Sequence, residues 1–149
     1  MNYQELLKYN FGNKENFSKI ALLDEVLSLI NNNKIILIEV KEESDDFKEL
    51  VDIVFNIINK YQLNIYIMSF NYELIKYFKT KYNKCGLVIG MGLNTKKLYN
   101  NFNFNVVSYN YRNKVEMKET FIWTINEVKE DIHKFNIITD KPYLFNTNN

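Results

Sequence analysis

One apolar segment of this chain ends in a carboxylate and an amine. Glu39 and Lys41 follow the aliphatic run from Ile35 to Ile38, and Val40 separates them. Because side chains alternate along a strand, both charges would lie on one face. A carboxylate within an apolar strand is costly unless a cation or a metal is its partner. The pair could therefore form a divalent-metal or substrate site, with Glu39 as ligand and Lys41 facing an anion. Alternatively, the strand simply ends there, and both groups are solvated or paired with each other.

Three other apolar segments end in polar or aromatic residues. Trp123, the only tryptophan, could form the wall of a small-molecule pocket or pack in the core. Asp140 could be a carboxylate at the rim of a site, or it could cap the turn before Pro142. Ser69 closes a third segment. In α/β folds, ligands bind at the C-terminal ends of the strands, so these groups are candidates for a shared site.

The chain has one histidine and one cysteine, which limits the reactions that its own side chains can catalyse. His133 lies in a polar segment and is expected at the surface. Cys85 has no histidine near it in the sequence, so a buried small side chain is favoured over a nucleophile. A mechanism that uses two histidines as acid and base is excluded for this chain alone. The segment at residues 90–92 is too short for a phosphate-binding loop, and no nucleotide-binding glycine pattern occurs.

The composition is that of a folded protein without a strong net charge. Of 149 residues, 46% are hydrophobic and 15% are aromatic, which is enough to build a core. The formal net charge is +1, and Arg112 is the only arginine among 19 basic residues, which argues against nucleic-acid binding. The sequence shows no secretion signal, and no apolar run is long enough to span a membrane, so we expect a cytoplasmic protein.

Hydrophobic periodicity predicts alternating helices and strands. Helices are predicted at about residues 2–9, 22–30, 46–61, 71–82, 95–101 and 127–135. Strands are predicted at about residues 34–41, 64–70, 86–90, 105–109, 120–125 and 136–139. Capping boxes at residues 2–5 and 46–49 predict where two of the helices begin. In the helix at residues 22–30, the apolar positions with helical spacing are Leu22, Val26, Leu29 and Ile30.

This alternation predicts an α/β fold of mostly parallel strands joined by right-handed crossover helices. The segment at residues 110–119 is too short and polar for a full crossover helix, so the strand–helix units shorten toward the C-terminus. We expect one domain over residues 1–145 and a frayed, Asn-rich tail at residues 146–149.

Five short motifs follow one another along the chain. They are Leu-Asp-Glu-Val-Leu (residues 23–27), Ile-Glu-Val-Lys (38–41), Met-Ser-Phe-Asn-Tyr-Glu-Leu-Ile (68–75), Ile-Trp-Thr-Ile-Asn (122–126) and Ile-Ile-Thr-Asp-Lys-Pro (137–142). In this order and spacing they resemble the C-terminal part of the glycerophosphodiester phosphodiesterase family. The segment at residues 3–12 is similar to the short helix that precedes that part, so the resemblance covers most of the chain.

The resemblance implies a partial or truncated TIM-type (βα) barrel and a link to lipid metabolism. Members of this family hydrolyse glycerophosphodiesters to glycerol 3-phosphate and an alcohol, with a divalent cation such as Ca²⁺ or Mg²⁺. Glu39 matches the position of the family's third acidic metal ligand, so we expect it to be a metal ligand. Trp123 matches a residue that lines the family's pocket, and Ser69 and Asn126 match motif positions. These three residues and Lys41, beside Glu39, are the expected substrate-binding residues.

The family's His-Arg-Gly motif, its Glu-x-Asp metal pair and its second catalytic histidine all precede the matched part. The resemblance therefore implies a truncated domain, a pseudoenzyme that is inactive alone. Two alternatives stay open. The chain could be the C-terminal piece of a split enzyme, completed by another chain that supplies the missing strands. It could also be a non-catalytic binding or scaffold module that associates with itself through open sheet edges.

Overall fold

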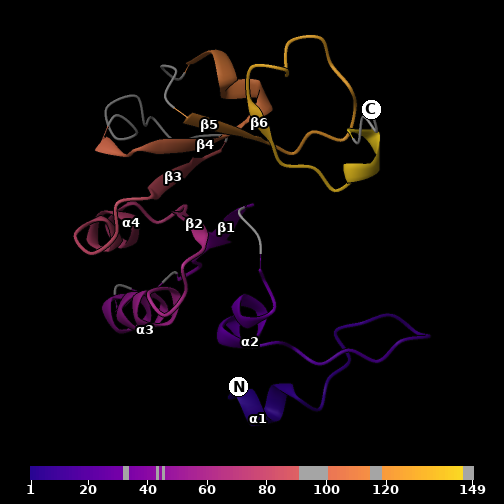
Figure 1. The fold of residues 1–149 in the computed structure, drawn as a ribbon, viewed down its shortest axis with the longest axis vertical. Helices are drawn as coiled ribbons and strands as arrows, with labels where there is room; N and C mark the ends of the chain where they lie inside the picture. Colours follow the sequence, from indigo (N-terminus) through magenta and orange to yellow (C-terminus); the bar gives the residue numbers. More distant parts are fainter. Residues whose placement is uncertain (32–33, 43, 45, 91–100, 115–118, 146–149) are drawn as a thin grey trace.

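The structure, a computed structural model, describes residues 1–31, 34–42, 44, 46–90, 101–114 and 119–145. Among these residues, six strands form one sheet in which every neighbouring pair is parallel. The strands are β1 (Ile35–Glu39), β2 (Asn64–Ser69), β3 (Cys85–Ile89), β4 (Phe104–Ser108), β5 (Glu119–Trp123) and β6 (Asn136–Ile137). Their order across the sheet is their order in the chain. Figure 1 shows that the sheet curls into an open half-barrel, which confirms the predicted partial TIM-type fold.

The helices are α1 (Tyr3–Leu6), α2 (Leu23–Ser28), α3 (Lys48–Ile58) and α4 (Tyr72–Lys79), with the 3-10 helices η2 (Tyr109–Lys114) and η3 (Pro142–Leu144) in the C-terminal part. Helices α2, α3 and α4 lie on the convex side of the sheet (Figure 1). Helices α3 and α4 are the crossovers from β1 to β2 and from β2 to β3. No helix among the described residues is both long enough and apolar enough to cross a bilayer.

Two apolar layers follow from the alternation of side chains along the strands. On the convex side, Ile65 and Ile67 of β2 pack with Leu74, Ile75 and Phe78 of α4, and all five are buried. This layer fixes the two crossover helices to the sheet. It belongs to the largest of the three hydrophobic clusters among the described residues.

The concave side is filled by an aromatic cluster. The rings of Tyr66, Phe104 and Phe121 meet edge to face, with centroids 5.0 to 5.9 Å apart. Gly86 of β3 makes room for them, because a Cβ atom at this position would lie 2.4 Å from the ring of Phe104. The Tyr66 hydroxyl donates a hydrogen bond to Glu119 (3.0 Å). The base of the half-barrel is therefore a packed interior.

The predicted helix at residues 127–135 is wrong, because this segment forms turns. Its backbone hydrogen bonds close isolated four-residue turns, such as Phe135 N–H to Ile132 O (3.0 Å). The Asp131 side chain is held by Tyr109 and Arg112, and Ile132 is buried. Tertiary contacts thus hold the segment without a regular helix.

Other boundaries also differ from the sequence prediction. The capping box at residues 46–49 is wrong, because Phe47 is the N-cap of α3 and makes no side-chain cap. The box at residues 2–5 is confirmed, but α1 ends at Leu6. Strand β6 has two residues where four were predicted. The predicted helix at 95–101, except for Asn101, and the tail at 146–149 lie outside the described residues.

Helix α2 presents apolar residues on two sides. Leu23, Leu27 and Ile30 pack into the convex core. Leu22, Val26 and Leu29 are exposed by 44%, 43% and 83%. Three of the four apolar positions that predicted this helix therefore face away from the core.

Candidate functional site

A cavity of ≈ 290 Å³ opens on the concave side, near the C-terminal ends of the strands. It contains two of the predicted site residues that lie far apart in the sequence, Glu39 and Trp123, and Lys41 at its rim. The other lining residues are Met68, Phe70, Val88, Val106, Thr124 and Ile138. The walls are thus mostly apolar, and the few polar groups come from the ends of β1 and β5 and from the residues that follow them.

Glu39 is only partly neutralised by its neighbour. Its Oε2 atom lies 3.5 Å from Lys41 Nζ, and the side chains are exposed by 25% and 78% respectively. Its other oxygen, Oε1, is buried and has no hydrogen-bond partner. An exposed ion pair contributes about 0–1 kcal/mol, whereas a buried polar atom without a partner costs about 1–3 kcal/mol. The position of this carboxylate is therefore unfavourable for folding alone.

Trp123 is half-buried and forms one wall of the cavity. Its ring packs edge-on against Phe70, with centroids 5.9 Å apart and an interplanar angle of 88°. Gly90 of the neighbouring wall lies close to both rings, because a Cβ atom there would be 3.4 Å from Phe70 and 3.7 Å from Trp123. The indole Nε1–H is buried without an acceptor. Two residues that line the cavity therefore each have a buried polar atom without a partner, a donor in Trp123 and an acceptor in Glu39.

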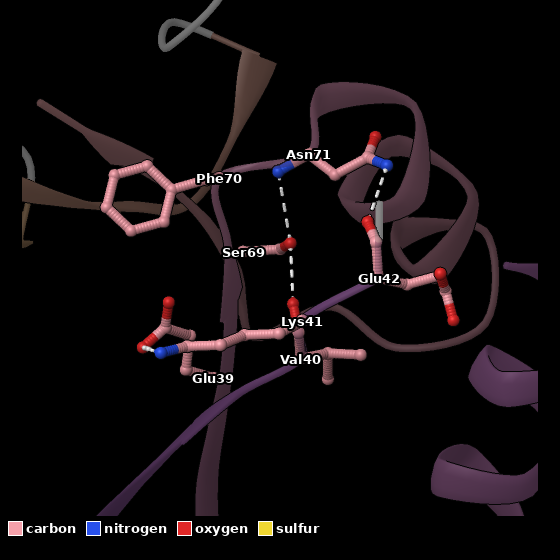
Figure 2. A pocket seen from close by; sticks show the side chains of 7 residues that line it. All are labelled: Glu39, Val40, Lys41, Glu42, Ser69, Phe70 and Asn71. Carbon is pink, nitrogen blue, oxygen red and sulfur yellow. Dashed lines mark hydrogen bonds and ion pairs between the residues drawn. The ribbon is translucent and has the colours of Figure 1, made fainter. Parts of the chain in front are cut away.

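Ser69 points to the other side of its strand and holds two strand ends together, as Figure 2 shows. Its hydroxyl donates to Val40 O (2.7 Å) and accepts from Asn71 N–H (3.1 Å). The Asn71 side chain donates to Glu42 O (3.2 Å) and caps α4 by accepting from Leu74 N–H (3.1 Å). These bonds position the segment that carries Glu39 and Lys41. Ser69, Asn71 and Glu42 also line a neighbouring hollow of ≈ 330 Å³ on the rim.

Asn126 ties the end of β5 to the end of β6. Its Oδ1 atom accepts from Thr139 Oγ1 (3.1 Å) and from Asp140 N–H (3.0 Å), and its Nδ2 group donates to Asp140 Oδ2 (3.0 Å). It is not among the described residues that line the cavity. The structure thus gives Asn126 and Asp140 a shared role in joining two loops, and a predicted ligand contact of Asn126 remains untested.

Sequence reasoning missed one polar network in the C-terminal part. Arg112 donates to Asp131 through Nε (2.7 Å) and Nη2, and it donates from Nη1 to Tyr109 O (2.9 Å). The Tyr109 hydroxyl donates to the other oxygen of Asp131 (3.0 Å). Hydrogen bonds from Arg112 hold the pKa of Asp131 below its usual value. Nothing in the local sequence links residues 112 and 131, so only the composition, with its single arginine, could have drawn attention to this site.

The histidine and the cysteine lie outside the cavity. His133 is exposed, and its Nδ1 atom is 2.6 Å from Glu130 O. Cys85 is buried on the convex side, which confirms the prediction of a packed small side chain. Burial raises the pKa of the Cys85 thiol to about 12. Neither residue is placed to act on a ligand at the strand ends.

The described residues do not fit a resident metal ion. No three acidic, histidine or cysteine side chains among them come together in a metal-binding group. Calcium and magnesium take about six or more oxygen ligands, with water often supplying several of them. Glu39 Oε1 could supply one. A cation at this site would need its other ligands from elsewhere.

The comparisons with known proteins identify the fold. No protein-family model matches the sequence, and no curated protein is similar to it in sequence. A solved structure is similar: a glycerophosphodiester phosphodiesterase from Parabacteroides distasonis ATCC 8503, with a TM-score of 0.71 and 19% sequence identity. The match covers 96% of this chain and 68% of that chain. At this identity the similarity establishes a shared fold over nearly the whole chain.

Proposed function

We propose that this chain is a glycerophosphodiester phosphodiesterase-like domain that binds a small polyol phosphate without hydrolysing it. One observation carries the proposal. The buried, unpartnered atoms Glu39 Oε1 and Trp123 Nε1 belong to residues that line the same cavity. A buried polar atom without a partner is uncommon in proteins, and its cost is removed when a ligand supplies the missing hydrogen bond.

The chemistry of the lining selects the class of ligand. The Glu39 carboxylate accepts hydrogen bonds, so it fits a hydroxyl group, and the indole N–H of Trp123 fits an oxygen. The Lys41 amine at the rim is largely exposed and suits a phosphate. Phe70 and Met68 supply apolar surface for a short carbon skeleton. Glycerol 3-phosphate and glycerophosphodiesters contain all of these groups.

We infer binding without turnover from the groups that are missing beside the cavity. General acid–base catalysis contributes about 10²–10⁴-fold to rate and needs a titrating group within hydrogen-bond reach. The one histidine, His133, is not among the described lining residues. Because no three metal-ligating side chains come together among the described residues, the proposed binding does not require Ca²⁺ or Mg²⁺.

Intrinsic fluorescence tests the binding proposal, because Trp123 is the only tryptophan and lies in the cavity wall. We expect glycerol 3-phosphate and glycerophosphocholine to change its emission, with Kd on the order of 0.1–1 mM for so small a ligand. Glu39→Gln should weaken binding at least about tenfold, which is the loss of one charge-assisted hydrogen bond. Glu73→Gln, an exposed carboxylate on α4, is the matched control and should leave binding unchanged.

Two outcomes would overturn this function. Absence of a fluorescence change and of calorimetric heat up to about 10 mM of both ligands, with and without Ca²⁺ or Mg²⁺, would show that the cavity does not bind them. Metal-dependent release of choline from glycerophosphocholine, lost in Glu39→Gln, would show that the domain is an enzyme.

A stability measurement separates a binding role of Glu39 from a structural one. Glu39→Leu removes the unpartnered oxygen, so we expect it to raise the free energy of unfolding by about 1 kcal/mol. If the ion pair with Lys41 were the reason for this carboxylate, the same substitution would lower the stability instead. Urea unfolding at pH 7 measures the sign.

The second candidate function is the C-terminal part of a split enzyme, in which another chain supplies further strands. The observation that favours it is the outer edge of β1, which pairs with no strand among the described residues. Mixing the purified chain with a candidate partner should then create metal-dependent hydrolysis that neither chain has alone. Hydrolysis that stays at the level of the buffer would exclude that partner.

A further inference from the structure

The two edges of the half-barrel are built differently. Strand β6 forms one edge with two residues, and Pro142 follows in η3. Short strands and prolines are the usual means of protecting a sheet edge from pairing. Strand β1 forms the other edge with five aliphatic or charged residues and no proline. Among the described residues no strand pairs with its outer side. This edge, residues 35–39, is therefore open.

The open edge has a regular set of backbone groups. Val40 N–H donates to Met68 O of β2 (2.8 Å). Because the direction of the backbone groups alternates along a strand, those of Ile36 and Ile38 also point toward β2. The N–H and C=O groups of Ile35, Leu37 and Glu39 therefore point outward. They repeat at the spacing that a second strand requires.

The helix that precedes this edge in the chain also carries exposed apolar residues. Helix α2 precedes β1 and lies beside it in Figure 1. Its exposed residues Leu22, Val26 and Leu29 repeat at helical spacing. Scattered exposed apolar residues need no explanation, but a helical row beside an unpaired strand indicates an interaction surface. We call residues 22, 26, 29 and 35–39 the β1 flank.

We propose that the β1 flank is a homodimer interface, in which β1 pairs antiparallel with β1 of a second copy. A two-fold axis perpendicular to the sheet, midway between Leu37 of the two copies, sets Ile35 opposite Glu39 of the other copy and leaves both α2 helices on the convex side of the joined sheet. Such an interface is self-complementary, because each element meets its own equivalent. The formal net charge of +1 means that two copies repel each other only weakly.

The structure favours a second copy over a partner that completes an eight-stranded barrel. Such a partner would have to bridge both edges, since the barrel closes only when its last strand pairs with its first. The β6 edge offers two residues for this. A homodimer needs only the β1 edge, which has five residues. One short strand and one helix side per copy fall at the lower end of stable interface sizes, so we expect a dimer constant on the order of 10 µM.

Light scattering across a concentration series tests the dimer. We expect the mass to rise from 17.9 kDa toward twice that value between about 1 and 200 µM. Ile35→Pro removes an outward N–H without breaking the ladder to β2, and Leu29→Lys charges the α2 row. Each should weaken the dimer at least about tenfold. Val128→Lys is the matched control, because Val128 is apolar and 71% exposed but lies outside the β1 flank, and it should have no effect.

A direct readout needs no variant. Amide hydrogen exchange of Ile35, Leu37 and Glu39 should slow as the concentration of the wild-type protein rises, while that of the α3 amides stays constant. A mass of 17.9 kDa at every concentration would overturn the proposal. A dimer that neither variant weakens would overturn this interface. If Leu29→Lys fails to fold by circular dichroism, Ile35→Pro and the exchange data still decide. The proposal does not depend on ligand binding, so each can fail without the other.

Discussion

The two halves of the sheet connect their parallel strands in different ways. In the N-terminal half, parallel strands are joined by α-helices of 11 and 8 residues, α3 and α4. In the C-terminal half, β4 to β6 are also parallel, but the described parts of their connections are the 3-10 helix η2 and a segment of turns. A crossover therefore needs length and a buried anchor, and it does not need an α-helix.

What covers the convex side differs accordingly. Helices α3 and α4 bury Val51, Ile58, Leu74 and Phe78 against the strands. In the C-terminal half a smaller cluster of Ile122, Ile125 and Ile132 lies beneath the Arg112–Asp131–Tyr109 network. Burial of apolar area is worth more than hydrogen bonds at the surface. We therefore expect the N-terminal half to carry most of the stability.

The largest effect should come from the helical half. Phe78 is fully buried in α4, and Phe78→Ala should cost about 3–5 kcal/mol because it leaves a large cavity. Urea unfolding should be followed by circular dichroism, which reports on the helices, and by fluorescence of Trp123 in β5. If the two transitions coincide, the halves unfold as one unit. If Phe78→Ala left the fluorescence transition unchanged, the two halves would not unfold as one unit.

A smaller loss of stability is expected from a substitution in β3, where the two halves of the sheet meet. Gly86→Ala adds a methyl group 2.4 Å from the Phe104 ring, which Tyr66 and Phe121 hold in place. We expect a loss of about 1–3 kcal/mol in the free energy of unfolding. Gly90→Ala is the matched control on the same strand side, because its nearest neighbour would be 3.4 Å away. Equal losses in the two variants would show that Phe104 can move aside.

The smallest effect should come from the polar network, and it should depend on pH. Because the pKa of Asp131 is lowered in the folded protein by Arg112, this group stabilises the fold above its unfolded pKa of about 3.9. The stabilisation is lost as the pH falls through the lower folded pKa. Asp131→Asn should thus lower Tm at pH 7 and have little effect at pH 2. A Tm difference that is the same at both pH values would contradict this account.

Much of the fold could be predicted from the sequence, because it depends on buried runs. The aliphatic residues of β1 to β3 identify these strands and their parallel arrangement. The turns at residues 127–135 could not be predicted, because Asp131 bonds to residues about twenty positions away. Likewise, apolar spacing in α2 marked a helix correctly but not which side is buried. Helical periodicity carries no information on the neighbour that a side meets.

The candidate site was predicted in part. The position of Glu39 and Lys41 at a strand end and of Trp123 at another placed them at the same end of a parallel sheet, and the structure brings them to one cavity. The roles of Ser69 and Asn126 depend on which face each side chain takes and on which backbone group is nearest. Ser69 faces the helices, and Asn126 bonds to the chain beyond β6. These contacts join residues that no short motif connects.

The order of the strands also bears on how the protein is made. Because each strand pairs with the one that precedes it in the chain, every new strand emerging from the ribosome finds its partner already synthesised. Paired residues of neighbouring strands lie at most 29 positions apart in the chain, as Ile35 and Asn64 do, so no strand has to wait for a distant segment. The half-barrel can grow one strand at a time from β1 to β6. Growth starts from an edge that remains available and ends on a strand of two residues.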